Sequence, residues 1–110
     1  MSFNVIVTGG FKKHAKSIGK KHHSFKSDLE ALIGSLEQKP LQGEPLGKDC
    51  YKIRMAISSK SKGKSGGSRL ITCVKIVDQN VYLLTVYDKS DKESISDKEL
   101  DDLLKIAGLL

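Results

Sequence analysis

A cationic stretch in the middle of the chain, residues 51–69, most constrains the fold. It contains six basic residues and no Asp or Glu: Lys52, Arg54, Lys60, Lys62, Lys64 and Arg69. Both of its ends have the composition of β-strands, and a Gly/Ser-rich segment joins them. The stretch therefore predicts a β-hairpin with a basic connector. Because Lys and Arg neutralise phosphates and glycines let backbone amides approach them, RNA or DNA is the first partner to consider.

The length and the charge limit the other possibilities. At 110 residues the chain supports one modest core, and we expect a single domain over residues 1–110. The formal net charge is +6, and the excess is concentrated in the central stretch and in the run from Lys12 to Lys26. A basic balance favours a nucleic acid, an acidic protein or an anionic membrane as partner, without choosing among them.

The first residues do not resemble a targeting signal. The apolar run within residues 1–7 lacks a preceding cationic region and is too short to span a bilayer, which predicts a cytoplasmic protein with no membrane partner. Cys50 and Cys73 lack metal-ligand spacing, so we expect free thiols. The three histidines fall on a polar helical hairpin and are expected at the surface: His14, His22 and His23.

The apolar pattern predicts an α+β fold. A first strand and two helices are expected before Pro40, with Ser24 capping the second helix, and the Gly- and Pro-containing segment 41–47 is expected to be a loop. Ser96 and Glu99 form a capping-box pattern for a last helix. Three further strands are expected at 50–57, 69–77 and 80–88. We therefore expect a mostly antiparallel four-stranded sheet, flanked by an N-terminal helical hairpin and a C-terminal helix.

Strand alternation gathers the candidate functional residues on one face of this sheet. It places Tyr51, Ile53, Met55 and Ile57 in the core and Lys52 and Arg54 on the other face. A hairpin that pairs Ala56 with Arg69 adds Arg69 to that second face. A following hairpin that pairs Val77 with Val81 adds Tyr87 and Lys89, and leaves Tyr82 in the core.

Such a cluster can cleave RNA, because the barrier to attack by a 2′-hydroxyl on the adjacent phosphate is largely charge build-up at phosphorus. Arginine forks suit that charge. Lys52 or a lysine of the connector is a candidate base, and Tyr87 or another lysine a candidate acid. No acidic residue or histidine is expected in the cluster, which argues against a two-metal nuclease and against a paired-histidine ribonuclease. The alternative is a solvated face or a passive docking patch, and spacing does not decide between them.

Three segments carry a family resemblance. Residues 49–54, 64–71 and 81–89, with Lys-Ser-Gly-Gly-x-Arg followed by Tyr-x-Lys, resemble the RelE/ParE toxin superfamily, particularly its HigB-like branch. The order of the expected elements is also similar. The resemblance implies the toxin of a type II toxin–antitoxin system, an mRNA endoribonuclease that cuts in the ribosomal A site without metal or cofactor. It further implies a cognate antitoxin, encoded by the adjacent gene, that covers this surface.

Carried to this chain, the resemblance implies a role for each candidate. Lys52 and Arg54 bind phosphate or transfer protons, Arg69 stabilises the transition state, and Tyr87 and Lys89 complete the catalytic set. Three connector lysines contact RNA: Lys60, Lys62 and Lys64. The chain departs from the family where several relatives place a functional tyrosine after the last strand, because Ile95 stands at the nearest equivalent position.

Two other functions remain open on the same fold. One is a ParE-like inhibitor of DNA gyrase, against which the combination of Lys52, Arg54 and Arg69 argues because a gyrase inhibitor has no evident need for it. The other is a non-catalytic RNA-binding relic, which would bind RNA in a salt-sensitive way without cleaving it.

Overall fold

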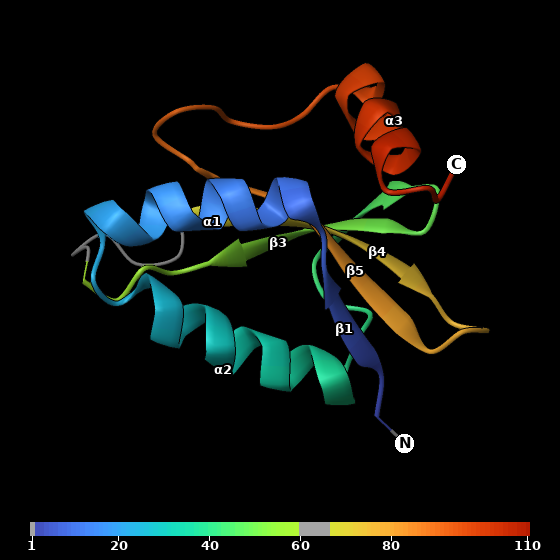
Figure 1. Ribbon diagram of the computed structural model, residues 1–110, viewed down its shortest axis with the longest axis horizontal. Coiled ribbons are helices and arrows are strands. Elements are labelled where there is room, and N and C mark those ends of the chain that lie inside the picture. The colour runs from blue at the N-terminus through green and yellow to red at the C-terminus, as the bar shows by residue number, and fades with distance from the viewer. Residues whose placement is uncertain (1, 60–66) are drawn as a thin grey trace.

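The protein forms an α+β fold in the computed structural model, which describes residues 2–59 and 67–110 (Figure 1). The elements in chain order are β1 Asn4–Val7, α1 Gly9–Lys21, α2 Phe25–Gln38, β2 Glu44–Gly47, β3 Cys50–Met55, β4 Ser68–Lys75, β5 Asn80–Asp88 and α3 Asp97–Ile106. None of the described helices is long and apolar enough to cross a membrane.

The described strands form one sheet in the order β1-β5-β4-β3-β2. Strand β1 pairs with β5 in parallel, and the other neighbours are antiparallel. The expected hairpins β3–β4 and β4–β5 are therefore confirmed. The expected number of strands was one too low, because residues 44–47 pair with β3 as an edge strand. Pro45 is tolerated there because an edge strand needs hydrogen bonds on one side only.

Two apolar clusters pack on opposite faces of the sheet. The larger one joins the helical hairpin to the sheet through Phe11 and Ile18 of α1 and Phe25 and Leu36 of α2. The smaller one contains Leu100 and Leu104 of α3 and one of the candidate site residues, Tyr87. Figure 1 shows α3 set apart from the α1–α2 pair. The candidate face is thus the face that α3 partly covers.

Local sequence signals account for the ends of α1 and α3. The Thr8 hydroxyl accepts from the backbone N–H of Phe11 and caps α1. Ser96 and Glu99 form the expected capping box. Ser24 precedes α2 as expected, but its hydroxyl makes no capping bond and instead contacts Asp28 and Ser59.

Both hairpins differ from the expected register, with different consequences. Arg54 rather than Ala56 lies opposite Arg69, a shift of two residues that leaves every side chain on its expected face. Val74 rather than Val77 lies opposite Val81, because β4 ends at Lys75 and β5 begins at Asn80. Further along, the β4–β5 pairing contains an irregularity between Ile71 and Thr72. This bulge reverses the alternation along β5. The expectation that Tyr82 and Tyr87 lie on different faces is therefore wrong: Tyr82 packs against the cluster that contains Tyr87.

Gly67, at the start of the returning strand, generates a first prediction. A Cβ there would lie 2.4 Å from the carbonyl oxygen of Met55, which is strand backbone and cannot easily move. We expect Gly67→Ala to lower the free energy of unfolding by about 1–3 kcal/mol, measured by urea denaturation. Gly34→Ala is the matched control, because a Cβ at this helical position meets nothing within 4 Å. The control should gain about 0.5–1 kcal/mol. Equal midpoints for Gly67→Ala and wild type would contradict this account.

Candidate active site

The centre of the candidate site is a row of three side chains across the middle of the sheet. Arg54 of β3 lies opposite Arg69 of β4, and Arg69 lies opposite Tyr87 of β5. Two arginines and one tyrosine thus come from three neighbouring strands and share one face. The sequence predicted this grouping, and the pairing makes it tighter than expected because all three occupy a single row.

The two arginines face each other at close range. The backbone N–H of Val74 donates to the carbonyl of Asp49, so the alternation of bonds along β3 and β4 makes Arg54–Arg69 a non-hydrogen-bonded pair. In such pairs the Cα atoms are about 4.5 Å apart, and like charges repel. Arg54 is exposed, whereas Arg69 is only 4% exposed and donates from Nη1 to the carbonyl of Ser68 at 3.1 Å. A repulsive pair at the surface of a core is more typical of a binding site than of a stabilising contact.

Tyr87 is a buried phenol beside these charges. It is 9% exposed, and its hydroxyl has no hydrogen-bond partner within the described part of the chain. Burial raises the pKa of Tyr87, and the neighbouring Arg69 partly offsets that rise. The Lys92 ammonium lies 5.2 Å from the centre of the ring. The phenol is therefore protonated at neutral pH and able to donate a proton to a group that reaches it.

The other predicted site residues lie around this row. Lys52 occupies the next row of the same face and forms an ion pair with Glu44 of β2, with 3.8 Å between Nζ and Oε2. Lys89 follows the end of β5, where its backbone N–H donates to the carbonyl of Gly67 and its Nζ lies 4.0 Å from Glu93. The three connector lysines lie outside the described residues: Lys60, Lys62 and Lys64.

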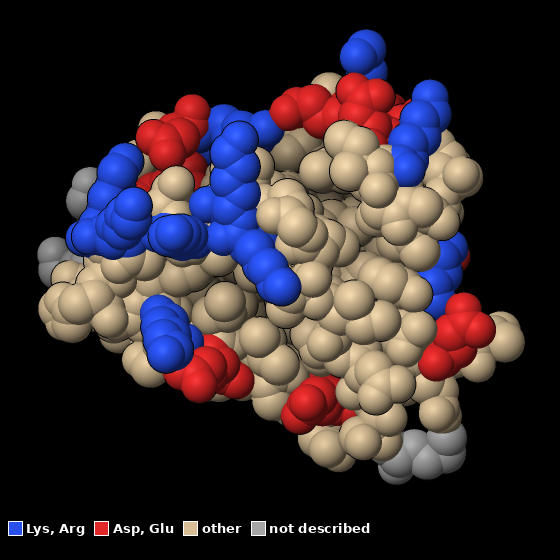
Figure 2. All heavy atoms as spheres, in the orientation of Figure 1, with Lys and Arg blue, Asp and Glu red and all other residues tan. Residues whose placement is uncertain are grey.

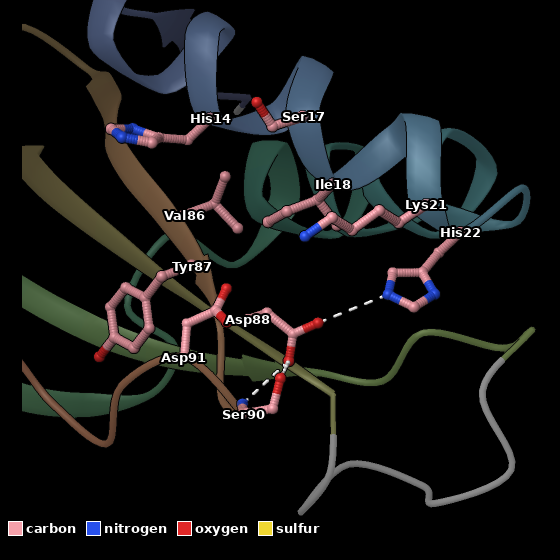
Figure 3. A pocket seen from close by; sticks show the side chains of 10 residues that line it. All are labelled: His14, Ser17, Ile18, Lys21, His22, Val86, Tyr87, Asp88, Ser90 and Asp91. Carbon is pink, nitrogen blue, oxygen red and sulfur yellow. Dashed lines mark hydrogen bonds and ion pairs between the residues drawn. The ribbon is translucent and has the colours of Figure 1, made fainter.

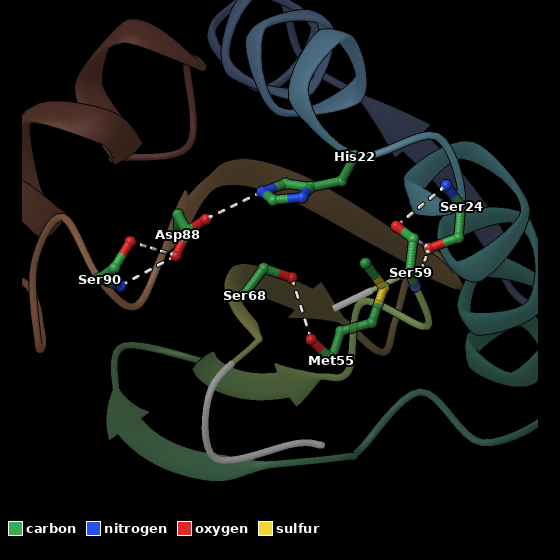
Figure 4. A network of polar contacts seen from close by, with 7 residues as sticks. All are labelled: His22, Ser24, Met55, Ser59, Ser68, Asp88 and Ser90. Atoms are coloured by element: carbon green, nitrogen blue, oxygen red, sulfur yellow. Dashed lines mark hydrogen bonds and ion pairs between the residues drawn. The ribbon is translucent and has the colours of Figure 1, made fainter. Parts of the chain in front are cut away.

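Sequence reasoning missed a histidine–carboxylate pair beside the row. His22, expected at the surface, is half-buried, and its Nε2 lies 3.4 Å from Oδ2 of Asp88 (Figures 3 and 4). Asp88 also accepts from the backbone N–H and the hydroxyl of Ser90. The pair lies next to the row but not in it, because Asp88 follows Tyr87 directly on β5 and successive strand side chains point to opposite faces. The signal was Asp88 itself, an acid inside an apolar strand, which is costly to bury without partners.

The start of the basic connector is tied to the helical hairpin. The Asp28 carboxylate accepts from the backbone N–H and the hydroxyl of Ser58 at 2.8 and 2.6 Å, and from the hydroxyl of Ser24 at 2.9 Å. Ser24 in turn contacts Ser59 (Figure 4). These bonds fix where the chain leaves for the connector. Burial raises the pKa of Asp28, but the Ser58 and Ser24 hydrogen bonds outweigh it and hold the pKa below its ordinary value.

A second basic surface lies on α1, in the region where the sequence concentrates positive charge. The helix contains no acidic residue, and five exposed lysines follow its outer side: Lys12, Lys13, Lys16, Lys20 and Lys21. Figure 2 shows basic side chains gathered over α1 and acidic ones near α3. Such a helix suits contact with a phosphate backbone. No three His, Cys, Asp or Glu side chains in residues 2–59 and 67–110 are grouped to hold a metal ion.

Comparison with known families supports the resemblance seen in the sequence. The family model described as the RelE toxin of the RelE/RelB toxin–antitoxin system matches residues 6–110. No curated protein matches the sequence significantly.

Solved structures share the fold. A mutant of the E. coli toxin RelE in the free state is 18% identical, with a TM-score of 0.64, and the match covers 96% of this chain and 97% of that one. The isolated E. coli RelE toxin is 18% identical, with a TM-score of 0.61 and coverage of 96% and 99%. In the RelBE2 toxin–antitoxin complex from Mycobacterium tuberculosis the match is 17% identical, with a TM-score of 0.59 and coverage of 80% and 99%.

The unpartnered phenol generates a second prediction. Tyr87→Phe should leave the free energy of unfolding unchanged or raise it by about 1 kcal/mol, because it removes a buried hydroxyl that makes no hydrogen bond. Tyr82→Phe is the matched control: its hydroxyl accepts from Asn80 at 3.2 Å, and removing that bond should cost about 1 kcal/mol. Urea denaturation compares the two. A larger loss for Tyr87→Phe than for Tyr82→Phe would show that the Tyr87 hydroxyl has a partner.

Asp28 generates a third prediction, which depends on pH. Asp28→Ala should destabilise the protein by about 1 kcal/mol at neutral pH, through loss of its hydrogen bonds. Because the folded-state pKa is lowered from 3.8, this stability is present above that value and is lost as pH falls through the folded-state pKa. Urea midpoints at several pH values measure the difference. Glu30→Ala, an exposed acid on the same helix, is the control. A difference independent of pH would exclude the carboxylate as its source.

Proposed function

Because the chain belongs to the RelE toxin family, we propose that it is the toxin of a type II toxin–antitoxin system and cleaves mRNA on the ribosome without a metal ion. The observation that carries this proposal is the Arg54–Arg69–Tyr87 row, which combines two guanidinium groups with a protonated phenol. Phosphate binding alone requires neither the close like-charge pair nor the buried hydroxyl. Cleavage requires charge stabilisation and proton transfer at neighbouring positions.

The reaction is an attack of the 2′-hydroxyl on the adjacent phosphate. In the proposed mechanism the exposed Arg54 binds the scissile phosphate, and Arg69 beneath it stabilises the charge that builds up on the phosphorus oxygens. Tyr87 gives its proton to the leaving 5′-oxygen. Lys52 lies one row away and is the nearest described candidate to accept the 2′-hydroxyl proton. It acts as a base only in its neutral form, so in the proposed mechanism its ion pair with Glu44 opens when RNA binds.

In this proposal, lysines around the Arg54–Arg69–Tyr87 row help to bind the RNA substrate. Lys89 follows the end of β5. Lys60, Lys62 and Lys64 lie outside the described residues, and we propose that they also contact RNA. The lysines of α1 provide a further surface for ribosomal RNA. We propose a single domain acting in the cytoplasm with the ribosome and mRNA as partners. The RelBE2 complex supports a cognate antitoxin as the other partner.

One observation favours a second candidate, RNA binding without cleavage. Arg69 and Tyr87 are both buried, and Tyr87 lies in the cluster that α3 contacts. If this cover were permanent, only Arg54 and the surrounding lysines would reach RNA. The two candidates differ in whether cut RNA is formed, so one experiment separates them.

The fourth prediction tests cleavage by primer extension on a reporter mRNA after brief induction in bacteria. Arg54→Gln should reduce cutting roughly 100-fold, because it removes one charge from the developing transition state. Arg54 is exposed, so this change does not open a cavity, as a truncation of the buried Arg69 would. Lys39→Gln, at the C-terminal end of α2, is the control with the same loss of charge.

Each other outcome has a distinct meaning. Wild-type cutting that survives in Arg54→Gln would remove the arginine row from the mechanism. Arrested growth without cut mRNA would favour inhibition of DNA gyrase, and normal growth without cut mRNA would favour RNA binding alone.

A further inference from the structure

The two cysteines of the chain face each other across the β3–β4 hairpin. Cys50 of β3 is the partner of Cys73 in β4. The backbone N–H of Val74 donates to the carbonyl of Asp49, so Cys50–Cys73 is the non-hydrogen-bonded pair next to that bond. The Cα atoms of such a pair are about 4.5 Å apart, and a disulfide spans about 4.4–6.8 Å between Cα atoms. The sheet therefore holds two thiols at a separation that one S–S bond can bridge.

The side chains of the pair also converge on one place. The Sγ atoms of Cys50 and Cys73 lie 3.4 and 4.0 Å from the carbonyl oxygen of Lys48. The hydrogen bond with Cys50 lowers the pKa of Cys73 against the opposing effect of burial, and the Lys75 ammonium lowers it further. The same bond and burial raise the pKa of Cys50. Cys73 is thus the thiol that loses its proton first, and a thiolate is the reactive form of cysteine.

The pair is shielded from solvent but lies next to the protein surface. Both cysteines are buried and pack in the cluster that contains Leu100 and Leu104 of α3. Cys50 directly follows Lys48 and Asp49, the exposed turn between β2 and β3. These two turn residues have φ of 55° and 65°, as a two-residue turn of type I′ requires. A small oxidant such as hydrogen peroxide therefore needs to pass only this turn to reach the thiols.

Metal binding is the other use of paired thiols, and the surroundings do not favour it. A structural zinc site takes four ligands. Within residues 2–59 and 67–110, no group of three or more His, Cys, Asp or Glu side chains is placed to hold a metal ion. Two thiols that face each other without further ligands are suited to oxidation, and intracellular disulfides of this kind are mostly redox-sensing.

We infer that Cys50 and Cys73 are a redox-sensitive pair, which hydrogen peroxide converts to a reversible disulfide between β3 and β4. The inference does not depend on the proposed function. The Cys73 thiolate attacks one peroxide oxygen, the O–O bond breaks, and the leaving hydroxide takes up the proton that Cys73 released, which gives water and a sulfenic acid. The Cys50 sulfur then attacks the Cys73 sulfur, and the hydroxyl group leaves with the Cys50 proton as water. Two thiols are oxidised, and one peroxide is reduced to two water molecules.

The position of the disulfide gives it a structural effect on the candidate site. Cys50–Cys73 lies two rows from Arg54–Arg69, on the same face of the same hairpin. The two arginines repel each other across the pair of strands, whereas the disulfide joins those strands covalently. Oxidation therefore stabilises the hairpin that carries the arginines, and reduction removes that constraint.

The fifth prediction is that hydrogen peroxide cross-links the folded wild type within one molecule. Mass spectrometry should show the loss of two hydrogen atoms from a monomer and a bond between the tryptic peptides 49–52 and 70–75, which dithiothreitol then breaks. The oxidised form should have a urea midpoint roughly 1–2 M higher than the reduced form, because the cross-link restricts the unfolded chain. Two free thiols that persist at a peroxide dose sufficient to oxidise free cysteine overturn the proposal. Disulfides that form only between molecules, or only in urea, also overturn it.

Single-thiol variants are the matched controls. Cys50→Ser and Cys73→Ser each keep one cysteine, so peroxide should leave their urea midpoints unchanged and should join no peptides within a molecule. A midpoint that rises with peroxide in either variant as much as in wild type assigns the effect to another oxidation and overturns the proposal. If a serine at one of these buried positions prevents folding, the joined peptides of wild type and their release by dithiothreitol decide the question without the variants.

Discussion

The antiparallel pairing of β3, β4 and β5 is the constraint on which the site depends. It places Arg54 opposite Arg69, where two like charges repel across a close pair. The same strands bury Ile53, Leu70 and Val86 on the other face, beneath the helical hairpin. Because burial of each such side chain contributes about 1.5–3 kcal/mol, the apolar face holds together a pairing that the charged face opposes. The arginines are thus kept close by strands that cannot separate without opening the core.

The alternation of side chains explains which parts of this site follow from the sequence. The sequence placed Lys52, Arg54 and Arg69 on the correct face of the sheet. The β3–β4 register differs from the expected one by two residues, and a shift by an even number leaves every side chain on the same face. The expected separation of Tyr82 from Tyr87 was wrong because the bulge between Ile71 and Thr72 reverses the alternation, and no turn residue in the sequence marks that bulge. The edge strand β2 was missed because Gly43, Pro45 and Gly47 indicate a loop. Local composition cannot show that such a segment pairs with a strand beside it.

Contacts between residues far apart in the sequence could not be predicted from it. The His22–Asp88 pair joins positions 66 residues apart in number, at the end of α1 and the end of β5. An acid in an apolar strand indicates that some partner exists, but the partner depends on how α1 crosses the sheet. A pocket lined by His14 and Asp91 depends on the same crossing (Figure 3). The sequence therefore predicted which residues of neighbouring strands come together. The contacts between α1 and β5 depend on how the helix packs on the sheet.

Two acids of this basic protein form ion pairs with lysines near the arginine row. Glu44 pairs with Lys52 and Glu99 with Lys92, and each pair holds a cation in place beside the arginine row. Because both pairs are partly exposed, their contribution to stability is small, and their effect is on position.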